Sequence, residues 1–353
     1  MNLTLVEQIV NAVLYEGYML YPYRPSSVKN RQRWTFGGIY PQAYSLAQGG
    51  AEASSIQTEC LVVSDQHAVL DIKVRFLHLL AREVGMLDAP MRELPTDVEP
   101  AFHTVAALQV GEKLFQTWQE AVEREIGILD VHLSELIGQP RRQPFGFPAW
   151  RELELLRESD GMAAGVIARE QQPLEGLVEL AAEAVGERLY KITVRVLNLT
   201  PLAEASLRNR DVALMRSFAS THTILGVRQG EFISLLDPPE HLIEAAASCN
   251  NVGVWPVLVG QDGERNTLLA SPIILYDYPQ SAPESPGDLF DGTEIDEILT
   301  LRIMTMTEEE KREMGAVDAR ARAMLDRTEA LTREQLMQLH GTMRSMRPLE
   351  DSQ

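Results

Sequence analysis

Two long runs of alternating apolar and polar residues constrain the fold of this chain more than any other feature. The first begins at about Ile56 with IQTECLVV and continues as AVLDIKVRFLHLLA, and the second, ERLYKITVRVLNLT, lies near residues 187–200. A period of two residues is typical of strands with one buried face. The fragments IKVRFLHL and ITVRVLNL are alike, with Arg75 and Arg195 at matching places. We therefore expect equivalent or neighbouring strands of one sheet.

Helical spacing is confined to shorter stretches. Residues 3–20 place apolar side chains on one face of a helix, which we expect to end at Gly17. A second helix is predicted near residues 114–125. A third is predicted after Asp237, which is the expected N-cap because Pro238 follows it in the first turn.

Turn signals and capping boxes mark further boundaries. Hairpins are predicted around residues 228–230 (RQG) and 261–263 (QDG), because a glycine adopts the positive φ of a tight turn. Residues 307–310 (TEEE) and 332–335 (TREQ) match the capping box that starts a helix. The C-terminal part of the chain is therefore predicted to be helical.

Together these patterns predict an α+β protein with a strand-rich core, sandwich-like or barrel-like, an N-terminal helix and a helical C-terminal tail. Residues 1–50 hold that helix and an irregular basic and aromatic segment, and residues 51–278 form the core. Prolines near residues 140–150 predict a linker that could divide the core into two subdomains. Residues 279–353 comprise an acidic, proline-rich segment and the C-terminal helices.

The charge balance narrows the classes of partner. The chain has 353 residues, with 51 acidic against 32 basic side chains and a formal charge of -19. A phosphate backbone or an anionic membrane would repel such a surface, so we expect no nucleic acid and no membrane. The chain has no apolar run near the ~20 residues that a membrane span needs. It also lacks a secretory signal pattern, so we expect a cytoplasmic protein.

Residues with catalytic chemistry are scattered along the chain. The seven histidines lack zinc-site spacing, Cys60 and Cys249 lie outside any CxxC pair, and neither a phosphate-binding glycine loop nor a GxSxG elbow occurs. We therefore expect two buried, reduced thiols and no cofactor. An alternative is an enzyme whose site is assembled by folding, with His222 and Cys249 as a nucleophile pair and Asp237 or Asp277 as acid, base or metal ligand.

Five carboxylates gather in residues 288–297. Hard cations take such oxygen ligands, but the spacing is not that of an EF-hand loop. We favour helix capping by Asp291, with the acids that follow stabilising the positive helix N-terminus, over a metal site formed by Asp288, Asp291 and Glu294. No metal is therefore predicted.

One segment opposes the overall charge, because it carries basic and aromatic residues and no acid. Exposed arginine and aromatic side chains are typical of binding surfaces, although the same residues could form ion pairs with the chain's own carboxylates. The predicted binding residues are Tyr21, Tyr23, Arg24, Lys29, Arg31, Arg33 and Trp34.

The segments NVGVWPVLVG (251–260), SPIILYDYPQ (271–280), APESPGDLFDGTEIDEILTLRI (282–303) and LYEGYMLYPYRPSSVKNRQRWTFGGIYP (14–41) resemble a family of uncharacterised bacterial proteins. The resemblance is nearly full-length. The family is associated with gene clusters of nickel–iron hydrogenases and their maturation factors. This implies a non-enzymatic accessory or assembly factor that binds a protein of a larger redox complex. The resemblance assigns no catalytic residue. A structural subunit of a homo-oligomer is the remaining alternative.

Overall fold

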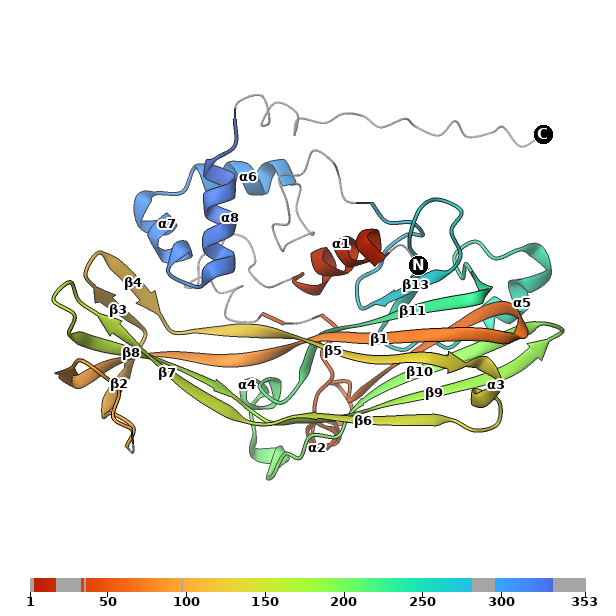
Figure 1. The fold of residues 1–353 in the computed structure, drawn as a ribbon, viewed down its shortest axis with the longest axis horizontal. Helices are drawn as coiled ribbons and strands as arrows, with labels where there is room; N and C mark the ends of the chain where they lie inside the picture. Colours follow the sequence, from red (N-terminus) through yellow and green to blue (C-terminus); the bar gives the residue numbers. More distant parts are fainter. Residues whose placement is uncertain (1–2, 17–32, 35, 97, 281–295, 333–353) are drawn as a thin grey trace.

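A computed structural model describes residues 3–16, 33–34, 36–96, 98–280 and 296–332 (Figure 1). The helices are α1 (Leu3–Leu14), α2 (Gln42–Ala47), α3 (Leu133–Leu136), α4 (Arg210–Leu214), α5 (Ile243–Ala247), α6 (Asp296–Met304), α7 (Glu308–Gly315) and α8 (Ala319–Glu329). The strands are β1 (Ser55–Met91), β2 (Phe102–Val105), β3 (Ala107–Val110), β4 (Lys113–Gln116), β5 (Trp118–His132), β6 (Arg141–Phe147), β7 (Trp150–Arg157), β8 (Ala163–Gln171), β9 (Leu174–Gly186), β10 (Leu189–Asn198), β11 (Phe218–Ile233), β12 (Trp255–Leu258) and β13 (Thr267–Ser271).

Strand β1 is the central strand of the sheet, because five other strands pair with it. It pairs in succession with β10, β5 and β2 along one edge, and with β11 and then β8 along the other. Within the described residues, eleven strands form one antiparallel sheet with the main order β12-β13-β11-β1-β10-β9-β6. Register shifts between Ser64 and Val69, and between Arg75 and Leu77, interrupt the pairing of β1 with β11. Such bulges bend a strand, which is how so long a sheet can curl.

The curled sheet encloses the largest apolar core. Figure 1 shows β6 and β9 running below β1, β5 and β11. Buried side chains from these strands meet between the two halves, and the ring centroids of Phe76 on β1 and Phe218 on β11 are 4.7 Å apart. Phe145 of β6 packs against both rings. The expected α+β class with a strand-rich core is therefore confirmed.

Helices cover the opposite face of the sheet. Helix α1 buries Val6, Ile9 and Val10 against residues of β11, β12 and β13. Helices α6, α7 and α8 pack on Leu77 and Leu79 of β1. In Figure 1 these four helices lie on the same side of the sheet. The expected N-terminal helix and C-terminal helical tail are thus both present.

Several local predictions are confirmed. Strands β1 and β10 are direct neighbours, with Ser55 opposite Leu197 and Val63 opposite Leu189. Residues 261–263 lie between the paired strands β12 and β13, and Gly263 has a φ of +86°. The capping box at residues 307–310 is formed as predicted. Gly17 and residues 333–335 lie outside the described residues.

The predicted helix at residues 114–125 is wrong, because this segment forms β4 and the first half of β5. Strand β5 pairs with β1 from Trp118 to His132, and this long-range pairing outweighs the local helical spacing. The predicted hairpin at residues 228–230 is also wrong. Strand β11 continues through this point, where Gln229 has a φ of 58° and the register with β1 shifts.

Two further boundaries differ from prediction. The proline-rich segment at 140–150 is not an irregular linker, because β6 and β7 occupy it. Pro144 is tolerated because β6 ends the main strand order and so has an edge that needs no donor. Asp237 is not an N-cap, since the 3-10 turn Glu240–Leu242 begins after Pro239 and leads into α5.

Candidate functional site

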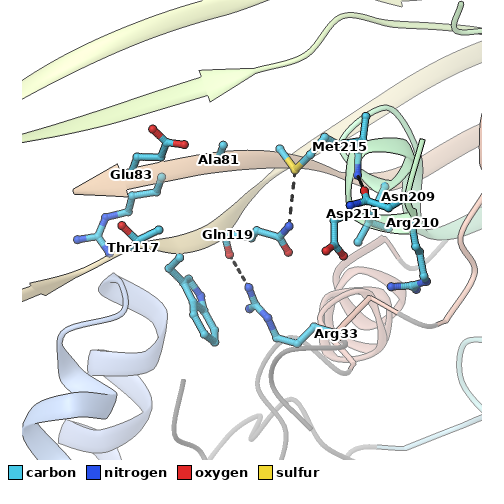
Figure 2. Close-up of a pocket in the computed structure, with 13 residues that line it drawn as sticks. Arg33, Ala81, Glu83, Thr117, Gln119, Asn209, Arg210, Asp211 and Met215 are labelled. Atoms are coloured by element: carbon cyan, nitrogen blue, oxygen red, sulfur yellow. Dashed lines mark hydrogen bonds between the residues drawn. The ribbon is translucent and has the colours of Figure 1, made fainter. Parts of the chain in front are cut away.

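A pocket of about 530 Å³ lies where β1 and β5 approach α4 (Figure 2). Its volume falls within the ~300–1,000 Å³ typical of ligand pockets. Helix α4 begins at Asn209, whose side chain accepts a hydrogen bond from the Val212 amide. The lining residues are Arg33, Ala81, Arg82, Glu83, Thr117, Trp118, Gln119, Asn209, Arg210, Asp211, Val212, Leu214 and Met215.

Arg33 is the most buried cation of this pocket, with an exposed fraction of 4%. Its Cζ lies 3.6 Å from the centre of the Trp118 ring and 5.0 Å from that of Trp34, and one guanidinium nitrogen donates to the carbonyl oxygen of Gln119 at 2.8 Å. Figure 2 shows Arg33 pointing toward Gln119. Burial lowers the pKa of Arg33 to about 9, so the guanidinium is still charged at neutral pH.

Trp118 contributes a hydrogen-bond donor to the lining. Its side chain is 8% exposed, and its Nε1 finds no acceptor among the residues that the structure describes. The neighbouring Gln119 side chain is held in place, since its Nε2 donates to Met215 Sδ at 3.8 Å. A buried donor without an acceptor costs free energy, which a ligand oxygen would recover.

Arg82 and Arg210, which also line the pocket, each lie near a carboxylate. Arg82 Nε lies 3.3 Å from Glu120 Oε1, and its Nη1 donates to the backbone oxygen of Val317 before α8. Arg210 Nε lies 3.7 Å from Glu52 Oε1. These contacts connect the pocket walls to the sheet, the C-terminal helices and the segment after α2.

The predicted basic and aromatic surface is only partly described. Tyr21, Tyr23, Arg24, Lys29 and Arg31 lie outside the described residues. Arg33 and Trp34 are described, and the expectation that they are exposed is wrong, because Trp34 is 2% exposed and Arg33 stacks on Trp118. Sequence reasoning found Arg33 but missed Trp118 and α4, since no local pattern joins segments this far apart in the chain.

The proposed Cys/His pair is not formed. His222 is fully buried on β11 opposite Arg75 of β1, and its Nδ1 lies 2.7 Å from the Ser220 carbonyl oxygen. Cys249 follows α5, on the side of the sheet where Leu61 of β1 lies. About 45 Å of strand separates Leu61 from Arg75 along β1. Folding thus keeps the imidazole and the thiol in different parts of the molecule.

The pKa values of these two groups also move away from neutrality. Burial, with a smaller contribution from the nearby Arg75, lowers the pKa of His222 to about 4. Burial and the neighbouring Glu59 carboxylate raise the pKa of the Cys249 thiol to about 11. Near pH 7 the imidazole is therefore neutral and the thiol protonated, which is the form of cysteine that does not act as a nucleophile.

Of the remaining candidates of the enzyme hypothesis, Asp277 uses its carboxylate in structural hydrogen bonds, and Asp237 contributes its backbone amide. Asp277 accepts hydrogen bonds from the Leu258 amide at 2.7 Å and from the Ser234 hydroxyl. The amide of Asp237 donates to the same hydroxyl at 2.9 Å. These contacts tie the segment after β11 to the segment that follows β13.

The predicted metal ligands and the membrane-spanning potential of the helices complete the description of the chain. Asp288, Asp291 and Glu294 lie outside the described residues. Within the described ranges, no three His, Cys, Asp or Glu side chains gather in a way that could hold a metal ion. None of the described helices combines the length and the apolar character needed to span a bilayer.

Comparison with known proteins adds no relative: no family model matches the chain, and no curated protein matches it.

Proposed function

We propose that this protein is a non-enzymatic accessory or assembly factor that binds a protein of a larger redox complex. The sequence resemblance suggests a nickel–iron hydrogenase as that complex. The observation that carries the proposal is the set of exposed apolar side chains around β12, and the pocket at β1, β5 and α4 adds a partly exposed arginine, Arg210. Arginine is among the residue types that contribute most to binding energy at protein interfaces.

Exposed apolar side chains around β12 support a protein partner. This strand ends the main order of the sheet. Large apolar residues on and around it remain open to solvent, with exposed fractions between 45% for Trp255 and 84% for Tyr276. Trp255 lies on β12 opposite Ser271 of β13, and exposed apolar side chains favour association with another protein. The residues are Leu236, Ile243, Val252, Trp255, Ile274 and Tyr276.

The charge of the chain defines the partner further. With a formal net charge of -19, the protein should associate more readily with partners whose surfaces are neutral or cationic. We also propose that binding takes place in the cytoplasm, where the free thiols Cys60 and Cys249 would remain reduced. Fractionation of native cells tests the location, and recovery outside the cytoplasmic fraction would refute it.

Affinity purification from the native host tests the assembly role. A hydrogenase subunit or maturation factor should co-purify in stoichiometric amount, and deletion of the gene should lower hydrogenase activity, which a plasmid copy restores. Full activity in the deletion strain, with no hydrogenase protein recovered, would refute the proposal.

Surface variants identify the region that binds. The pair Trp255→Ser and Tyr276→Ser should lose the partner, because both side chains lie in the region around β12. The control pair is Leu46→Ser and Leu207→Ser, at residues that are 71% and 79% exposed in the region of α2. It should retain the partner. A homo-oligomer would instead appear by light scattering as a multiple of 39.5 kDa, with no foreign protein bound.

A further inference from the structure

Glu123 of β5 connects the N-terminal helix, the sheet and the C-terminal helices. Its Oε1 accepts a hydrogen bond at 2.9 Å from the hydroxyl of Tyr15, which follows α1 directly. The same oxygen lies 3.1 Å from Arg320 Nη2 of α8. Its Oε2 accepts from Arg75 Nη2 of β1 at 2.9 Å. In Figure 1, α1 and α8 lie on the same side of β1 and β5, so one carboxylate of the sheet serves both helices.

Tyr15 and Arg320 also contact each other. The Arg320 Cζ lies 3.7 Å from the centre of the Tyr15 ring, and Nη2 donates to the Tyr15 hydroxyl oxygen. Burial raises the pKa of Tyr15 well above its ordinary value, although the Arg320 charge opposes this, so the hydroxyl keeps the proton that it donates to Glu123. Each of these three side chains contacts the other two, and the loss of one removes two contacts.

The contact of Glu123 with the sheet is more buried than its contact with α8. The Arg75 side chain is 11% exposed, and the Arg320 side chain is 41% exposed. Although burial by itself would raise the pKa of Glu123, the Tyr15 hydrogen bond and the charges of Arg75 and Arg320 lower it. The carboxylate is therefore ionised at neutral pH. Because water weakens an exposed ion pair more than a buried one, the Arg320 contact opens more easily than the Arg75 contact.

Both helices cover the same apolar part of the sheet. Leu77 of β1, directly opposite Glu123 in the pairing with β5, is fully buried. Its buried cluster also contains Leu14 at the end of α1 and Met324 of α8. Undocking of either helix would let water reach this cluster, which weakens the packing of the other.

We propose that Glu123 is a shared anchor through which α1 and α8 dock on the sheet cooperatively, so that displacement of either helix loosens the other. A partner that displaces one helix would thereby uncover Leu77 beneath both. The proposal concerns the fold itself and does not depend on the identity of the partner.

Native-state hydrogen exchange of the full-length protein tests this cooperativity, because it reports the local opening of each helix. Arg320→Met removes the guanidinium of α8 and keeps most of the apolar stem. Amides of α1 should then exchange about threefold faster or more, although no residue of α1 has changed. The matched control is Arg322→Met in the same helix, because this guanidinium donates to the Gly315 carbonyl oxygen of α7 at 2.7 Å. The control should accelerate exchange in α7 and α8 and leave α1 within about twofold of the wild type.

Tyr15→Phe is the reciprocal test. It keeps the ring beneath Arg320 and removes the hydroxyl, and the amides of α8 should exchange about threefold faster. Tyr15→Phe and Arg320→Met remove contacts of the same set of side chains. In the double variant, the acceleration in α1 should therefore be smaller than the product of the accelerations in the two single variants.

Unchanged exchange of α1 in Arg320→Met would overturn the proposal, and so would an equally large acceleration of α1 in Arg322→Met. A double variant whose acceleration equals the product of the single effects would show that the helices dock independently. Should the Arg320→Met protein fail to fold, Tyr15→Phe decides the question: faster exchange of α8 supports the shared anchor, and unchanged exchange refutes it.

Discussion

Removal of the Arg82 guanidinium should destabilise the protein and loosen its C-terminal helices. Arg82 is 5% exposed on β1, and it donates to the backbone oxygens of Gln116, at 3.0 Å, and Val317. Its Nε also lies 3.3 Å from Glu120 Oε1. Burial lowers the pKa of Arg82, and the Glu120 carboxylate opposes this. One side chain thus joins β1, β5 and the connection between α7 and α8.

The size of the effect follows from these contacts. Arg82→Met keeps most of the apolar stem and removes two hydrogen bonds to backbone oxygens, each worth about 1.5 kcal/mol when the donor is charged. Glu120 keeps a partner, since Arg169 Nε lies 2.9 Å from its Oε2. The desolvation cost of a buried arginine disappears as well, which offsets part of the loss. We expect the free energy of unfolding to fall by about 2–4 kcal/mol.

Urea unfolding monitored by circular dichroism measures the fall in the free energy of unfolding. Hydrogen exchange shows which part of the protein is destabilised. Amides of α7 and α8 should exchange faster in Arg82→Met, while those of β10 should change little. The control is Arg142→Met, at an arginine whose side chain is 66% exposed and pairs with Glu179 at 3.0 Å. It should cost less than about 1 kcal/mol. Equal losses in the two variants, or unchanged exchange in α8, would show that the reasoning is wrong.

Three further predictions concern stability. The pKa of His222, about 4, lies below the ~6.5 of a free imidazole, so stability present above pH 6.5 is lost as pH falls toward 4. His222→Gln should remove about 2 kcal/mol of the loss between pH 7 and pH 5, and parallel urea midpoints in the two proteins would contradict this. Gly37→Ala should cost about 2–4 kcal/mol, because Gly37 has a φ of +52° and a Cβ would lie 2.6 Å from Pro272 Cγ. Gly49→Ala is the control, because Gly49 has a φ of +66° and a Cβ there would have no atom within 4 Å, so this variant should cost about 1 kcal/mol. Thermal melts compare the two variants, and similar losses of stability would exclude the clash. Thr307→Ala should cost about 1 kcal/mol by breaking the capping box, with faster exchange at the start of α7, and an unchanged melt would refute the role of the cap.

The sequence-based predictions were correct where a feature depends on residues close together in the sequence, and wrong where it depends on residues far apart. The capping box at Thr307 and the turn at Gly263 were correct, because both depend on residues within a few positions of each other. The segment at 114–125 was not, because pairing with β1 outweighed its helical spacing. The continuation of β11 through Gln229 was missed for the same reason, since β1 holds that strand on both sides of the bulge.

The candidate site shows the same contrast between features set by local sequence and features set by long-range packing. Arg33 was identified from its composition, but its predicted exposure was wrong. Trp118 and α4 had no signal of their own, since an isolated tryptophan and a five-residue helix fit many environments. Their relation to Arg33 arises from the packing of β5 against α4 and the segment at 33–34.

The amino-acid sequence by itself determined the strand-rich character of the chain, its acidic charge, the apolar face of α1 and several turns. These properties follow from side-chain periodicity and from local hydrogen bonds, which act between residues close in the chain. The tertiary structure decided which strands flank β1, how deeply Arg33 is buried, and that His222 and Cys249 stay apart. Burial and electrostatic environment depend on residues brought together from distant segments, and their sum is set only when the sheet curls and the helices pack against it.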